Sequence, residues 1–109
     1  DELNDMPRAK YETWPHSPAK TVTVLCTVAD AGGLALAWPL LAAIAEELAG
    51  QQKTTAATAT ALEAVLRYLP EVRAAGVTVD LPNVAALAAR KGTSKAVTVA
   101  KRIAGLRGS

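Results

Sequence analysis

Phenylalanine is absent from the sequence, and cysteine and histidine occur once each. A single cysteine cannot form a disulfide within the chain, and Cys26 lies in an apolar stretch, which favours a buried and unreactive thiol. Without a disulfide framework, stability has to come from packing. This composition fits an intracellular protein, cytoplasmic or nuclear.

The scarcity of catalytic side chains indicates a protein that is not an enzyme. His16 has no carboxylate close in sequence to orient it as a base, so we expect an exposed imidazole. One histidine and one cysteine cannot form a zinc site, so no metal is expected. Glu46, Glu47 and Glu71 are best explained as solvated helix faces. The run Ala31-Gly32-Gly33 lacks the lysine of a phosphate-binding loop, so we expect no cofactor.

Long apolar runs are also missing. The longest, Leu34 to Ala45, is shorter than the ~20 residues of a membrane span and contains Pro39, so we expect no membrane span. The 109 residues suit one domain with a modest core. Because alanine and valine supply much of its apolar content, that core suits closely approaching helices. The sequence contains four aromatic residues, which are Tyr11, Trp14, Trp38 and Tyr68.

Acidic residues stop at Asp80, and every charged residue after it is basic. A segment of one sign attracts polyanions, and phosphate contacts supply most of the non-specific affinity for nucleic acids. The carboxy-terminal third therefore indicates a binding surface, with a solvated basic helix as the alternative. These basic residues are Arg90, Lys91, Lys95, Lys101, Arg102 and Arg107.

The chain divides into an amino-terminal arm and one helical domain. Residues 1–16 are polar, contain Pro7 and Pro15 and have no sustained period, so we expect a flexible arm. Residues 17–109 carry apolar positions at helical spacing, separated by glycine, proline and capping residues. The five expected helices cover residues 17–31, 36–49, 54–69, 82–92 and 93–108.

Two features leave alternatives open. Pro70 would either kink or end the third helix, because an interior proline removes a hydrogen bond. Residues 21–28 alternate and are rich in β-branched side chains, which is also typical of a strand. With further strands at residues 77–80 and 96–100, the chain would be a small α/β domain. The favoured prediction is an all-α, compact bundle of four to five short helices.

An internal similarity indicates how these helices are arranged. The stretch from Pro39 to Gly50 parallels the stretch from Pro82 to Gly92, and each is followed by a polar turn and a helix ending in Leu-Arg. Two copies are too few for a solenoid, so we expect two helical hairpins packed against each other.

The second of these hairpins resembles the core-binding domain of tyrosine recombinases and phage-type integrases. The resemblance rests on a helix from Asn83, a Gly-Thr-Ser turn and an amphipathic helix ending in Leu106-Arg107. It implies a non-catalytic DNA-binding module that clamps duplex phosphates, because the family's Arg, His-x-x-Arg and Tyr set belongs to a separate domain. The predicted nucleic-acid-binding residues are Arg90, Lys91, Thr93, Ser94, Lys95, Lys101, Arg102 and Arg107.

Residues 55–107 also resemble the N-terminal bundle of transcription elongation factors. Here Leu106 stands where that family has an aromatic residue. This second resemblance implies a helical docking domain for a peptide or protein partner.

Overall fold

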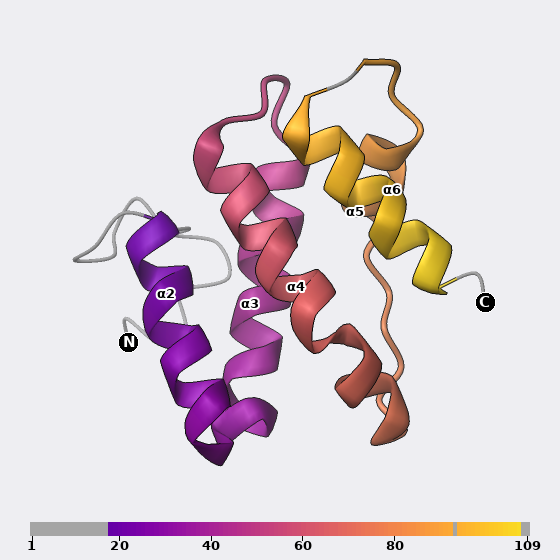
Figure 1. Cartoon of the computed structure of the whole chain (residues 1–109). Helices are drawn as coiled ribbons and strands as arrows, with labels where there is room; N and C mark the ends of the chain where they lie inside the picture. Colours follow the sequence, from indigo (N-terminus) through magenta and orange to yellow (C-terminus); the bar gives the residue numbers. More distant parts are fainter. Residues whose placement is uncertain (1–17, 93, 108–109) are drawn as a thin grey trace, which may run out of the picture.

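The computed structural model describes residues 18–92 and 94–107. Its elements are α2 Pro18–Val28, a π-helical turn η2 Ala29–Gly33, α3 Leu34–Ala49, α4 Ala56–Ala74, α5 Pro82–Ala88 and α6 Lys95–Arg107 (Figure 1). No strand occurs in this part of the chain, so the all-α prediction is confirmed and the α/β alternative is wrong. The predicted arm at residues 1–16 lies outside the described residues.

The turn between α2 and α3 depends on two glycines. Gly32 has a φ of 100°, which side chains with a Cβ rarely adopt. A Cβ on Gly33 would lie 2.7 Å from Val28 Cγ1. The backbone therefore reverses here, and α3 returns beside α2 (Figure 1). The helix at residues 36–49 was expected to have Pro39 in its first turn, but α3 begins at Leu34, so Pro39 lies further inside it.

The expectation that the chain has no membrane span needs a correction for the stretch Pro18–Ala49. Counted as one continuous helical segment, it has the length and mean hydropathy, 1.6, of a candidate membrane span, which the longest uninterrupted apolar run did not reveal. Length and composition are the only grounds for this candidate. In the structure the reversal at Gly32 divides the stretch into α2 and α3, which pack against each other.

Helix α4 begins at a capping box. Thr55 Oγ1 accepts a hydrogen bond from Thr58 N, and Thr58 Oγ1 accepts one from Thr55 N. The helix continues through Pro70 to Ala74, so of the two alternatives for Pro70 the one in which it ends the helix is wrong. Pro70 itself is exposed, whereas Leu69 and Val72 on either side of it are buried. Burial of these two side chains outweighs the hydrogen bond that proline removes.

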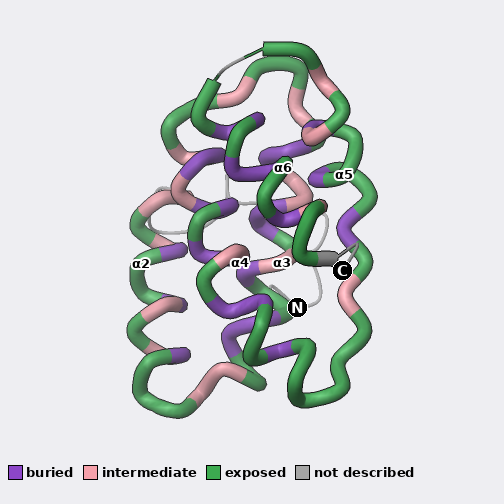
Figure 2. The backbone as a smooth tube through the Cα atoms, turned by 45° about the vertical axis from the view of Figure 1, so that its right-hand side comes forward, coloured by how far each residue is buried: buried purple, intermediate pink, exposed green. Residues whose placement is uncertain are grey.

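Helix α4 lies at the centre of the bundle and packs against α2, α3 and α6. The α3–α4 hairpin contacts the α5–α6 hairpin through α4 with α6 and α3 with α5, which confirms the predicted pair of packed hairpins. Buried positions face this shared interior (Figure 2). Fully buried Ala45, Ala61 and Ala100 allow the helices to approach closely. The largest fully buried side chains include Leu41, Leu48, Leu62, Leu69, Leu87 and Ile103.

Candidate nucleic-acid interface

Helix α5 is positioned by Glu46 of α3. The Glu46 carboxylate accepts hydrogen bonds from Asn83 N at 3.0 Å and Val84 N at 2.8 Å, and Asn83 Nδ2 donates to Glu46 O at 3.0 Å. Glu46 is therefore a half-buried cap for another helix, and not the solvated side chain that was predicted. The helix ends at Ala88, four residues before the predicted end.

Arg90 joins the turns of the two hairpins. Its guanidinium donates to Gln52 O at 3.3 Å and to Gln51 O at 3.2 Å, so the chain after α5 lies beside the chain before α4. We call residues 51–55, 90–92, 94 and 95 together the turn surface. Both of the turns that the internal similarity paired in sequence belong to it.

Three more predicted site residues lie in or beside α6 with partners of their own. Ser94 Oγ accepts a hydrogen bond from Val97 N at 3.3 Å and caps the helix. Lys95 Nζ pairs with Glu63 Oε2 of α4 at 3.2 Å. Lys101 Nζ donates to Ala88 O at 3.0 Å, which ties α6 back to α5.

The remaining predicted site residues are Lys91, Thr93, Arg102 and Arg107. Lys91 and Arg102 are exposed, and within the described part of the chain neither side chain makes a hydrogen bond or ion pair. Thr93 lies outside the described residues, as does the side chain of Arg107. Leu106, expected on the inner face of the amphipathic helix at residues 93–108, is 36% exposed.

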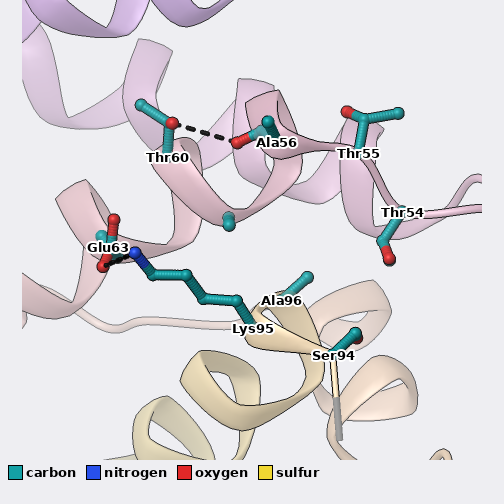
Figure 3. Close-up of a pocket in the computed structure, with 9 residues that line it drawn as sticks. Thr54, Thr55, Ala56, Thr60, Glu63, Ser94, Lys95 and Ala96 are labelled. Carbon is teal, nitrogen blue, oxygen red and sulfur yellow. Dashed lines mark hydrogen bonds and ion pairs between the residues drawn. The ribbon is translucent and has the colours of Figure 1, made fainter. Parts of the chain in front are cut away.

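A cavity of about 440 Å³ lies where α4 and α6 begin (Figure 3). The sequence predicted the α6 part of its lining but missed the α4 part, because the two parts lie some 40 positions apart. The parallel between the turns after Gly50 and Gly92 was the available signal. The cavity is lined by Thr54, Thr55, Ala56, Ala59, Thr60, Glu63, Ser94, Lys95 and Ala96.

A second polar cluster joins η2 to α4. Tyr68 Oη donates to Asp30 Oδ1 at 2.6 Å and to Cys26 O at 3.3 Å, and Arg67 Nη2 lies 3.2 Å from Asp30 Oδ1. The Arg67 guanidinium also lies over the Tyr68 ring, 5.1 Å from its centre. Burial, and then the hydrogen bond to Asp30, raise the pKa of Tyr68 well above its ordinary value. This arrangement holds the α2–α3 turn against α4.

Metal binding has no support in the described residues, since no group of three or more His, Cys, Asp or Glu side chains there could hold an ion. Cys26, predicted to be buried, is partly exposed at the edge of the core.

Comparison with known proteins found no match to the chain among protein-family models, curated proteins or solved structures.

Proposed function

We propose that this chain is a non-catalytic DNA-binding module that grips duplex phosphates through the α5–α6 hairpin. The observation that carries the proposal is the separation of charge. All charged residues after Asp80 are basic, and Arg90, Lys91 and Lys95 lie on the turn surface, where Lys53 of the first hairpin adds a fourth cation.

The partners of these cations support the proposal in different ways. Arg90 and Lys101 donate to neutral main-chain carbonyls, so their positive charges are held in place without being cancelled. The side chains of Lys91 and Arg102 are exposed and, in the described part of the chain, make no hydrogen bond or ion pair that would compete with a ligand. Cations that are fixed or exposed in this way attract a phosphate backbone without reading its bases.

Charge reversal tests this proposal. Changing Lys91, Lys95 and Arg102 together to Glu should abolish binding of a short fluorescent duplex measured by anisotropy. The melting temperature should change little, because the one pair broken, Lys95–Glu63, is exposed and worth at most about 1 kcal/mol.

The matched control is Lys20→Glu in α2, which lies across the bundle from α6 (Figure 1). The control reverses one charge outside the proposed surface, so it should retain more affinity than Lys91→Glu alone. Affinity of the native protein should fall as salt rises, and single Ala changes should each flatten the salt slope by about one unit. A native protein without DNA affinity at low salt would overturn the proposal.

The second candidate is a helical protein-docking domain. It is favoured by the outer side of α3, where Leu36 is 72% exposed and Leu40, one turn further on, is 37% exposed. Pro39 and Ala43 extend this uncharged strip. Exposed apolar strips of this kind are typical of interaction surfaces. This candidate becomes the leading one if the native protein fails to bind DNA.

A further inference from the structure

We propose that the cavity between α4 and α6 receives one phosphate of the DNA backbone, and that Glu63 limits binding there by holding Lys95. The inference rests on the proposed DNA-binding function. It adds a point of phosphate contact and a carboxylate that competes with DNA for the same ammonium group.

The size and lining of the cavity can admit a phosphate group. Its volume of about 440 Å³ exceeds that of a phosphate, and its walls come from both hairpins. Figure 3 shows Lys95 extending from the start of α6 across to Glu63 on α4, with Ser94 beside it. A ligand between the two helices would therefore meet the ammonium group of Lys95 directly.

Hydroxyl groups supply further donors. Ser94 Oγ accepts from Val97 N, so its own hydrogen remains available to donate to a phosphate oxygen. Thr60 differs, because its hydroxyl already donates to Ala56 O at 3.0 Å. Ser94 and Lys95 can thus both donate to a phosphate at this site, and both are among the residues that the sequence predicted.

Glu63 sets the limit on binding because of its charge. Arg90 and Lys101 hold neutral carbonyls, whereas Lys95 is paired with a carboxylate at 3.2 Å. Both members of this pair are exposed, with 67% of the Lys95 side chain and 49% of the Glu63 side chain accessible, so water and salt weaken the attraction. A phosphate can therefore replace Glu63, but the displaced carboxylate stays close and repels it.

Glu63→Gln tests this inference, since it removes the charge and keeps the size of the side chain. We expect this variant to bind the fluorescent duplex about two- to fivefold more tightly at low salt, the range of an exposed ion pair, with the difference shrinking as salt rises. Glu71→Gln is the matched control, because it removes the same charge from an exposed position two turns along α4. It should leave affinity unchanged.

Lys95→Ala separates this mechanism from a general charge effect. If Glu63 acts by holding Lys95, Glu63→Gln should change affinity by less than about a factor of two when Lys95 is absent. Equal gains with and without Lys95 would overturn the inference, as would equal affinities of the Glu63→Gln and Glu71→Gln variants. Melting curves check that each variant folds, and Glu63→Ala serves as a second neutral variant.

The two proposals can fail separately. If the native protein bound DNA but Glu63→Gln had no specific effect on affinity, the DNA-binding function would be supported and the inference about Glu63 would be wrong. If neither the native protein nor Glu63→Gln bound DNA, both would be wrong. Binding by Glu63→Gln without binding by the native protein would overturn the DNA-binding function, and with it the inference that rests on that function.

Discussion

Tyr68 shows how one buried polar group determines the position of a whole turn. Its ring is 6% exposed, and its hydroxyl donates to the Asp30 carboxylate and to Cys26 O. Both acceptors lie at or beside η2, so a single side chain of α4 holds the π-helical turn in place. Burial of a hydroxyl is tolerated because it keeps its hydrogen bonds.

The raised pKa of Tyr68 predicts a loss of stability in alkali. The folded chain keeps the proton, whereas an unfolded tyrosine loses it above about pH 10, so the unfolded state binds fewer protons there. The contribution of Tyr68 is fully present below that pH. Above about pH 10 this contribution to the free energy of unfolding falls by up to about 1.4 kcal/mol per pH unit.

Urea unfolding at increasing pH measures this effect, with Tyr68→Phe as the reference. The Phe variant should be about 1–2 kcal/mol less stable at neutral pH, because it loses the bond to Asp30. It should also lose less stability than the native protein on going to alkaline pH. Parallel stability curves for the two proteins would show that Tyr68 contributes nothing to the pH dependence.

At the scale of elements, α5 depends most on its neighbours. It has seven residues, which is too short for a helix that is stable by itself. Glu46 satisfies two amide groups at its start, and Arg90, just past its end, donates to the turn of the other hairpin. The position of Lys91 and of the turn surface therefore follows from contacts with α3 and with the turn that comes after it.

Glu46→Ala is expected to destabilise the protein by about 1–2 kcal/mol, because it leaves Asn83 N and Val84 N without their carboxylate acceptor. Chemical unfolding measures the total loss in the free energy of unfolding. Hydrogen exchange should locate it, with faster exchange at these two amides than in the native protein.

Glu71→Ala, an exposed change on α4, is the control and should cost less than about 0.5 kcal/mol. Unchanged exchange at Asn83 and Val84 in the Glu46→Ala variant would contradict the assigned capping role.

At the scale of the molecule, the two hairpins share one core. Contacts of α4 with α6 and of α3 with α5 join them, and the fully buried side chains come from both. Neither hairpin can bury its apolar side alone. The turn surface therefore exists only when both hairpins are folded.

We therefore expect one cooperative unfolding transition. Trp38, buried in α3, reports on the first hairpin by fluorescence, while far-ultraviolet circular dichroism reports on all helices. In a Trp14→Phe background, the two signals should have the same urea midpoint. Separate midpoints would mean that the hairpins unfold independently.

The sequence by itself determined the class of fold and the approximate helices. Apolar spacing, the Thr55 cap and the glycines at 32 and 33 act on the backbone within a few residues, so such signals can be read locally. The basic character of the carboxy-terminal third could be read in the same way.

Only the tertiary structure decided which partners these residues have. Residues 21–28 form a helix because Val22, Leu25 and Ala29 are buried at helical spacing, although their β-branched neighbours are also typical of a strand. The pairs Glu46–Asn83 and Asp30–Tyr68 join residues 37 and 38 positions apart.

The partners of the candidate site residues also depend on the tertiary structure. Its cations could be named from the sequence, but the pairing of Lys95 with Glu63 depends on how α6 crosses α4. Crossing angles and distances follow from the packing of whole helix surfaces. No short stretch of sequence contains them, so the pair Lys95–Glu63 at the cavity follows only from the packing of both hairpins.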